Sequence, residues 1–242
     1  MRILLCSVLL VSLAAAAADA PPPAFSEANL RATIQTLSSD QYGGRAPGSA
    51  GEALTTGYIT DKFKDYGLAP ADHGSYLQQV PMLQITADPR ATLEIAGGDA
   101  PLSLAYGTDM VISTPRPEAV VSLKDSPLVF AGYGVVAPQY GWNDYAGLDV
   151  KGKTVVVLVN DPGHADPKLF DGKAMTYYGR WTYKYEEAAR QGAAGILIVH
   201  DTEAAGYPWE VVQGSWTGPL EELPPGKAYL PAIQGWLSHD AA

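Results

Sequence analysis

Two short apolar runs, separated by an amphipathic segment, constrain the fold of this chain more than any other feature. The runs cover residues 155–159 and 196–199 and contain only valine, isoleucine and leucine. Each is too short for a typical helix, and its β-branched residues favour a buried strand. Four residues share one face of a helix expected over residues 181–191: Trp181, Tyr185, Ala188 and Ala189. Gly192 follows where such a helix usually ends, so the order predicts two parallel strands joined by a right-handed crossover.

The remaining sequence predicts two further helices and several short strands. Ser26 can cap a helix through residue 37, and a second helix is expected over residues 49–66, ended by Gly67. Two amphipathic helices with no strand between them cannot bury both apolar faces alone, so they need another layer. The expected strands are short and separated by turn residues: residues 76–86, 91–96, 101–104, 110–113, 120–123, 128–136 and 229–234. Together these elements predict an α+β fold.

The first twenty residues are typical of a secretory signal peptide. A basic residue, Arg2, precedes an apolar run and an alanine tract ending in small residues. The apolar run is shorter than the ~20 residues that a membrane span needs. We therefore expect residues 1–20 to be removed, and the mature chain to be periplasmic or extracellular and without a membrane span. The single cysteine, Cys6, lies in this segment, which leaves no disulfide or thiolate ligand.

Charge narrows the range of partners. The formal net charge is −10, which argues against nucleic acid or an anionic membrane as the partner.

Several long stretches of the sequence resemble a known family. G-Y-G-V-V-A-P (residues 132–138), residues 140–163 and residues 174–195 resemble the protease-associated (PA) domain of secreted two-zinc aminopeptidases. L-S-S-D-Q-Y-G-G-R-A-P-G-S-A-G-E (residues 37–52) is similar to the segment that opens the peptidase domain of those enzymes.

The resemblance implies a domain order and a function. Residues 91–242 would form a PA-type mixed β domain with a βαβ crossover, and residues 21–90 an incomplete N-terminal segment of an α/β zinc-peptidase domain. The chain would be the non-catalytic N-terminal portion of a secreted zinc aminopeptidase, with its PA domain shaping or covering access to the peptide site. Two zinc ions are expected only in a full-length enzyme. The alternative is a free-standing exported PA-type module that binds proteins or peptides.

The candidate zinc ligands are few and scattered. A two-zinc site needs about five or six protein ligands, and no two of the four histidines are spaced i, i+4: His73, His164, His200 and His239. His164-Ala165-Asp166 has the H-x-D spacing of the family, but N-D-P-G separates it from the strand, so we expect a surface loop. Glu186-Glu187 is expected on a solvated helix face beside Lys184 and Arg190. The sequence thus predicts no metal site, no catalytic residue and no activity for these residues alone; a hydrolase using His164, Asp166 and the glutamate pair is a third interpretation.

Aromatic residues are the remaining candidates for a functional surface. Packing in the core and loops is the favoured interpretation, and a surface for a peptide or protein is the alternative, since tryptophan and tyrosine concentrate at recognition sites. The candidate surface residues are Trp142, Tyr145, Tyr177, Tyr178, Trp181, Trp209 and Trp216.

Overall fold

The computed structural model of the chain describes residues 25–226 and 229–242. The predicted signal peptide, residues 1–20, lies outside the described residues. The chain divides into two compact units, Met1–Gln78 and Gln79–Ala242. Strand β1 (Leu83–Thr86) precedes the boundary expected at residue 91, yet it pairs antiparallel with β10 (Pro219–Glu222) within the second unit. No helix in the described part of the chain is long and apolar enough to cross a membrane.

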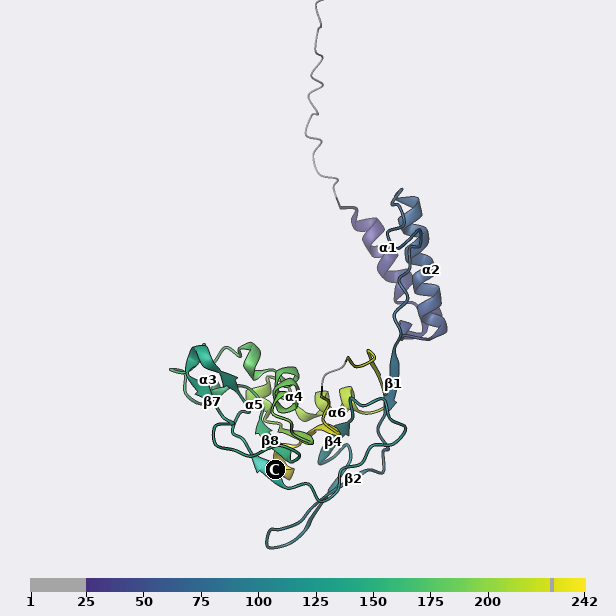
Figure 1. The fold of residues 1–242 in the computed structure, drawn as a ribbon. Coiled ribbons are helices and arrows are strands. Elements are labelled where there is room, and N and C mark those ends of the chain that lie inside the picture. The colour runs from purple at the N-terminus through teal and green to yellow at the C-terminus, as the bar shows by residue number, and fades with distance from the viewer. Residues whose placement is uncertain (1–24, 227–228) are drawn as a thin grey trace, which may run out of the picture. The chain divides into compact units, whose positions relative to one another are not determined.

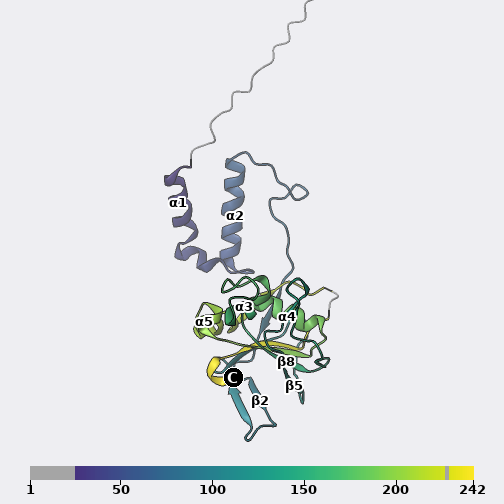
Figure 2. The same cartoon turned by 90° about the vertical axis from the view of Figure 1, so that its left-hand side faces the viewer.

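The first unit consists of two capped helices. Helix α1 (Glu27–Leu37), the 3-10 helix η1 (Asp40–Arg45) and helix α2 (Ala50–Asp65) follow one another, and α1 and α2 lie side by side (Figures 1 and 2). The Ser26 hydroxyl accepts from the Asn29 N–H at 3.2 Å, and the Ser49 hydroxyl accepts from the Glu52 N–H at 3.2 Å. These serines satisfy N–H groups that have no partner within the helix. Both predicted helices are confirmed.

The second unit is built on a five-stranded mixed sheet. Its strand order is β4-β11-β9-β8-β5: Met110–Ser113, Ile233–Leu237, Gly195–Val199, Thr154–Leu158 and Leu128–Phe130. The last four strands of this order are parallel, and β4 is antiparallel to β11. Helix α4 (Trp181–Arg190) connects β8 to β9, whose register places Val155 opposite Ile196. The predicted parallel strand pair and its helix are confirmed, and the fold is a mixed α+β fold.

Different elements cover the two faces of this sheet (Figures 1 and 2). On one face, α4, α5 (Thr202–Ala205) and α6 (Trp209–Trp216) bury the first core, which contains Val155, Val157, Ile196, Ile198, Tyr185, Ala188, Val212 and Trp236. On the other, the hairpin of β2 (Thr92–Ile95) and β3 (Leu102–Ala105) packs Leu104 against Leu197 and Leu237. The apolar residues of β8 and β9 alternate between these cores because successive side chains of a strand point to opposite faces.

Short elements connect the strands. The hairpin β6 (Val136–Ala137) and β7 (Trp142–Asn143) is joined by η2 (Pro138–Tyr140) and forms a separate two-stranded sheet. Helix α3 (Pro162–Ala165) and η3 (Tyr177–Gly179) lie between β8 and α4, and η4 (His239–Ala241) follows β11.

Several expected strands differ from the structure. No strand forms at residues 120–123, which have no pairing partner and lie between prolines. The strand expected over residues 128–136 is divided into β5 and β6 by a turn in which Gly132 and Gly134 have φ of 52° and 64°, values that interrupt a β ladder. Of residues 76–86, only Leu83–Thr86 is a strand. The closing strand begins at Ile233 rather than residue 229, beyond Pro231, which has no N–H for a ladder.

Two elements form where the sequence indicated only loops. Helix α6 follows Pro208 and carries Trp209 and Trp216 at its ends. Glu221 and Glu222 belong to β10, where the Gln84 amide donates to the Glu221 carboxylate at 2.7 Å. The partner of β10 is β1, which is distant in the sequence, so local pattern could not reveal the pairing.

Candidate functional site

Aromatic rings from separate segments meet beside the β6–β7 hairpin. Phe170 stacks on Tyr140 with ring centroids 4.4 Å apart, and it meets Trp142 and Tyr178 edge to face at 5.9 Å and 6.1 Å. We call Tyr140, Trp142, Phe170 and Tyr178 the aromatic cluster. Offset and edge-to-face contacts of this kind stabilise by about 0.5–1.5 kcal/mol each beyond apolar burial. Phe170 is therefore the centre of the cluster.

A buried carboxylate shapes the loop that carries Phe170. Asp161 is fully buried; its Oδ1 accepts from the Gly163 N–H at 3.0 Å, and its Oδ2 accepts from the Thr176 N–H at 2.9 Å and hydroxyl at 2.6 Å. The side chain thus joins the two ends of the loop. The sequence alone does not reveal this role, because the contacts to Thr176 are not local. A carboxylate with several hydrogen bonds is the form in which a buried charge is tolerated.

The backbone of Phe170 is in a strained conformation. Phe170 has φ of 47°, in the left-handed region that a bulky residue rarely adopts. Such strain costs on the order of 1–3 kcal/mol and persists only where the surroundings impose it. The Tyr140 hydroxyl donates to Asp171 Oδ1 at 3.0 Å, which fixes the neighbouring residue and raises the pKa of Tyr140. The loop is held by polar contacts on both sides of Phe170.

The aromatic cluster is partly open to solvent. Tyr140 is 39 % exposed, and the adjacent Tyr177 is 55 % exposed. Trp142, Phe170 and Tyr178 are half-buried beneath them and pack on Val135, Ala137 and Tyr183. Exposed rings on a rigid base can bind apolar, aromatic or cationic groups with little loss of side-chain entropy. This is the chemistry of a recognition surface.

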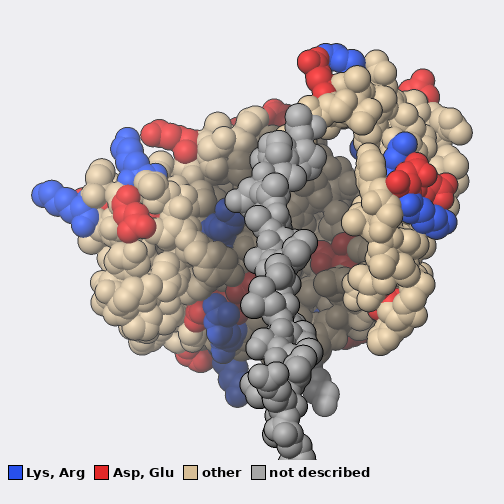
Figure 3. Space-filling model, turned by 90° about the horizontal axis from the view of Figure 1, so that it is seen from above, with Lys and Arg blue, Asp and Glu red and all other residues tan. Residues whose placement is uncertain are grey.

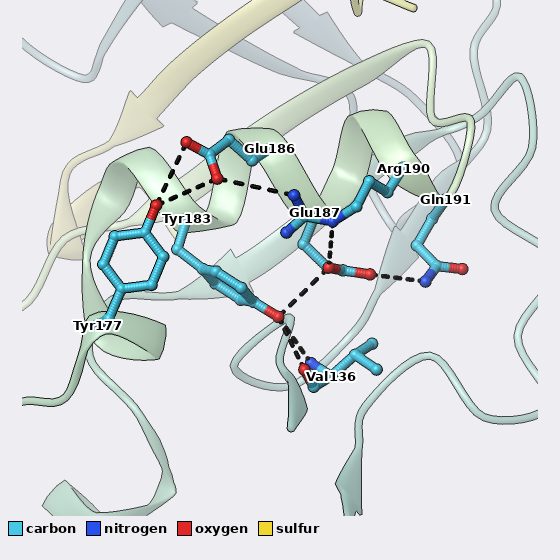
Figure 4. A network of polar contacts seen from close by, with 7 residues as sticks. All are labelled: Val136, Tyr177, Tyr183, Glu186, Glu187, Arg190 and Gln191. Carbon is cyan, nitrogen blue, oxygen red and sulfur yellow. Dashed lines mark hydrogen bonds and ion pairs between the residues drawn. The ribbon is translucent and has the colours of Figure 1, made fainter. Parts of the chain in front are cut away.

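A polar network joins α4 to β6 (Figure 4), and the ring of its Tyr183 lies 5.0 Å from the ring of Tyr178 in the cluster. The Tyr183 hydroxyl accepts from the Val136 N–H at 3.1 Å and donates to the Val136 carbonyl at 3.0 Å, which joins α4 to β6. Burial raises the pKa of Tyr183 to about 12. Arg190 Nε and Gln191 Nε2 donate to the Glu187 carboxylate at 2.8 Å and 2.7 Å.

The expectation that the glutamate pair is solvated holds only for Glu186. The Glu186 side chain is 51 % exposed and lies 3.2 Å from the Tyr177 hydroxyl, whereas the Glu187 side chain is 7 % exposed. The prediction was wrong for Glu187 because the β6–β7 hairpin, through Val136 and Tyr183, approaches this side of α4. Neither glutamate contacts a histidine in the described residues, so the pair is a structural element of the helix.

Lys184 is buried without a carboxylate partner. Its side chain is fully buried, and Nζ donates to the carbonyls of Tyr133 and Asn160 at 2.6 Å and 2.7 Å. Burial lowers the pKa of Lys184 to about 7, while Asp144 and Asp161 favour its charged form. The sequence indicated a solvated lysine, which was wrong. The ammonium instead joins the loops that follow β5 and β8.

The carboxyl ends of the parallel strands border a cavity. It has a volume of about 320 Å³, and its polar lining consists of Tyr133, His164, Asp201, Glu203 and His239. His164 lies on α3 and is half-buried, rather than in the surface loop expected for it. Ligands of open α/β sheets bind at such strand ends. In the described residues, no three His, Cys, Asp or Glu side chains are close enough to hold a metal ion.

His200 is a buried histidine whose ring nitrogen has a hydrogen-bonding partner. Its Nε2 lies 3.0 Å from the Tyr207 carbonyl, and burial lowers its pKa. Trp209 packs on its ring at 5.7 Å and donates from Nε1 to the Gly107 carbonyl at 3.1 Å. The surroundings of His200 are therefore those of a core residue.

The structure separates the seven predicted surface aromatics into groups. Trp142 and Tyr178 belong to the aromatic cluster, and Tyr177 lies beside it, with its ring 5.7 Å from Tyr183. Trp181 and Trp216 form another group with Tyr185, at 5.7 Å and 5.8 Å from its ring. Trp209 belongs with His200, and Tyr145 is buried in the core at 5 % exposure.

Sequence reasoning missed two members of the cluster, Tyr140 and Phe170. Tyr140 stands two residues before Trp142, and the proximity of these two rings was an available signal. Phe170 lies in a stretch without periodicity, so nothing local pointed to it.

Charge is distributed without a dominant basic area on the face shown in Figure 3. Acidic and basic side chains are interspersed there among uncharged ones.

Comparisons of the chain with protein-family models, with curated proteins and with solved structures found no match in any of the three.

Proposed function

We propose that this chain is the non-catalytic N-terminal portion of a secreted zinc aminopeptidase, with a PA-type domain that shapes or covers access to the peptide site. The observation that carries the proposal is the exposed apolar surface of the first unit. Leu30 and Ile34 of α1 are 61 % and 57 % exposed, and α1 has no buried residue. In α2, Leu54 and Phe63 are 40 % and 39 % exposed.

Exposed apolar residues on these helices indicate a surface that packs against another part of a protein. Amphipathic helices are stabilised mainly by packing of their apolar face, and helices of this length are marginal alone in water. Contiguous exposed apolar residues mark interaction surfaces. In the enzymes that this sequence resembles, the layer over the corresponding helices is the zinc-binding α/β part of the peptidase domain. The proposal assigns the same cover to α1 and α2.

The second unit fits the accessory part of the proposal. Its strand β8, its crossover helix α4 and its β6–β7 hairpin fall on the stretches that resemble PA domains: residues 132–138, 140–163 and 174–195. The aromatic cluster lies on this unit and offers a rigid surface to peptide side chains. In the proposed enzyme, this surface would select which peptides approach the zinc site rather than act on them.

Two measurements test the proposal. The purified chain is expected to hydrolyse no amino-acid arylamide, with or without added zinc; zinc-dependent turnover that His164→Ala abolishes would contradict this. Reading the transcript beyond the codon for Ala242 gives the second test. A continuing frame that encodes an apolar strand followed by His-x-Asp is expected, and an immediate stop codon would contradict the incomplete-enzyme account.

The aromatic cluster also favours a second candidate, a free-standing exported module that binds peptides or proteins. Peptides selected from a random library on the purified chain are then expected to lose affinity at least ~10-fold with Phe170→Ala, which removes the central ring of the cluster. Trp181→Ala is the matched control, because Trp181 is 40 % exposed but belongs to the other aromatic group. Equal loss in both variants, or no selected peptides, would contradict this candidate.

A further inference from the structure

We propose that the open edge of the five-stranded sheet binds an extended basic peptide, which adds to β5 as a sixth strand. Strand β5 stands at the end of the strand order and pairs only with β8. In the described part of the chain, nothing pairs with its other side. This inference concerns a different surface from the aromatic cluster and does not depend on the proposed function.

The backbone of β5 directs free hydrogen-bonding groups outward. Pro127 accepts from the Thr154 N–H at 2.9 Å, and Ala131 donates to the Val156 carbonyl at 3.0 Å. The N–H and C=O of one strand residue point to the same side, and this side alternates along a strand. Val129 therefore faces β8, while Leu128 and Phe130 direct their N–H and C=O groups away from the sheet. An added strand would satisfy these groups.

The side chains of the same two residues form an apolar surface beside the edge. Leu128 is 43 % exposed and Phe130 is 60 % exposed. Both border a cavity of about 460 Å³ whose other apolar lining includes Val156, Leu158, Val199 and Leu237. A sixth strand would lie about 4.7–4.9 Å from β5, so every second side chain of the peptide would reach this cavity.

Strand β5 has no charged residue on its open edge. Edge strands are commonly blunted by being very short or by charged residues, prolines or bulges. Strand β5 is short, but its three residues, Leu128, Val129 and Phe130, are all apolar. An uncharged apolar edge is the arrangement by which extended peptides bind through main-chain hydrogen bonds.

Charge identifies the kind of peptide. Glu94 and Asp125 line a neighbouring cavity of about 670 Å³ that Leu128 also borders, and among the described residues no lysine or arginine lines it. Asp240 stands in sequence between His239 and Ala241, which border the 460 Å³ cavity. Lys124 is the nearest basic residue before β5. Complementarity therefore favours a peptide with alternating apolar and basic residues. A second copy of β5 would bring equivalent carboxylates together, which disfavours pairing between two chains.

The probe is acetyl-Lys-Val-Lys-Val-Lys-Val-amide, tested with the full chain. One N-methylated form carries the methyl groups on every valine nitrogen and the other on every lysine nitrogen. Because only alternate N–H groups of an added strand face β5, one form is expected to bind like the parent peptide and the other at least 10-fold more weakly. Equal binding of both forms would overturn the proposal, since it would indicate charge attraction without strand pairing.

Amide hydrogen exchange locates the peptide. At saturating peptide, the amides of Leu128 and Phe130 are expected to exchange at least 10-fold more slowly, while the Val129 amide is unchanged. Phe130→Lys should weaken binding at least 10-fold, and Val120→Lys, which adds the same charge at a residue that is 84 % exposed, should not. Unchanged exchange at Leu128 and Phe130 would overturn the proposal. Protection without peptide that rises with protein concentration would also overturn it and would identify a second copy as the occupant.

Discussion

Helices α1 and α2 and the unit formed by β8, α4 and β9 were both predicted from the sequence, yet they differ sharply in burial. Helix α1 buries no residue and α2 buries only Gly51, whereas β9 buries four of its five residues. Local signals such as Ser26 and Ser49 at the helix starts determine where a helix begins. They do not supply the layer that stabilises it, and burial in the second unit comes from strands distant in sequence.

The magnitudes explain why capping cannot replace packing. A serine N-cap stabilises a helix by about 1 kcal/mol. Full burial of one valine, leucine or isoleucine side chain stabilises by about 1.5–3 kcal/mol. The core on the helical face of the sheet contains Val155, Val157, Ile196 and Ile198, so its burial exceeds the contribution of both caps several-fold.

Amide exchange should show the largest difference between the two regions. We expect the amides of α1 and α2 to exchange at least ~100-fold faster than those of β8 and β9, because exchange follows local opening and these helices have little burial to lose. Exchange measured by mass spectrometry, together with limited proteolysis, checks this. Equal protection in both regions would show that the apolar helix faces are already covered in the isolated chain.

Two isoleucine-to-alanine substitutions, one buried and one exposed, test how much each region contributes to stability. Ile198→Ala should lower the free energy of unfolding by about 3–4 kcal/mol, because Ile198 is fully buried in the core. Ile34→Ala should change it by less than ~0.5 kcal/mol, since Ile34 is 57 % exposed on α1. Chemical denaturation of both variants is the measurement. Similar losses would mean that α1 contributes to the folded core.

Lys184 should give the second unit a pH dependence that the helices lack. Its pKa is lowered to about 7 from 10.5, so between these values the unfolded chain binds more protons and stability rises with pH. The slope is expected to approach, at most, about 1.4 kcal/mol per pH unit. Above about pH 10 the trend reverses, because burial raises the pKa of Tyr183 to about 12 and the unfolded chain ionises first.

Denaturation of Lys184→Met across this pH range checks the assignment. The variant should lack the rise between about pH 7 and 10, whatever its stability at neutral pH. Lys62→Met on α2, where the lysine side chain is 42 % exposed, is the control and should keep the rise. A rise of the same slope in Lys184→Met would show that another group is responsible.

Gly192 should give the smallest of these effects. It follows α4 with φ of 76°, and a Cβ there would lie 3.4 Å from Lys151 Cγ. Gly192→Val should therefore destabilise by about 1 kcal/mol or more, through backbone strain rather than a severe clash. Gly57→Ala in α2, where a Cβ meets nothing within 4 Å, should be neutral or stabilising. A thermal melt that shows no loss in Gly192→Val would contradict the strain.

The sequence predicted those elements whose type is encoded locally. The runs that became β8 and β9 and the amphipathic spacing of α4 needed no distant partner to be recognised. The division of β5 from β6 depends on Gly132 and Gly134, whose turn could have been anticipated from their spacing. The pairing of β1 with β10 could not, because neither strand has a strong pattern of its own.

The candidate site was predictable only in part, for a similar reason. Trp142 and Tyr178 were identified as surface candidates. Their contact with each other's neighbours depends on Phe170, which lies in the loop that the buried Asp161 carboxylate closes. The burial of Lys184 had a signal that was overlooked. Lys184 lies three residues after Trp181 and four before Ala188, on the apolar face of α4. Its position along the helix therefore indicated burial, although its charge suggested exposure to solvent.

The closure of the Phe170 loop by Asp161 has a consequence for how this molecule can vary. Because one carboxylate holds Gly163 and Thr176 together, the residues between them form a segment whose ends are fixed independently of its contents. We therefore expect sequence changes inside the segment to alter the rings presented to a partner more than they alter the β8 and α4 framework. Because Asp161 closes this loop, substitutions within the loop could change which partner it binds while the sequence of the sheet stays the same.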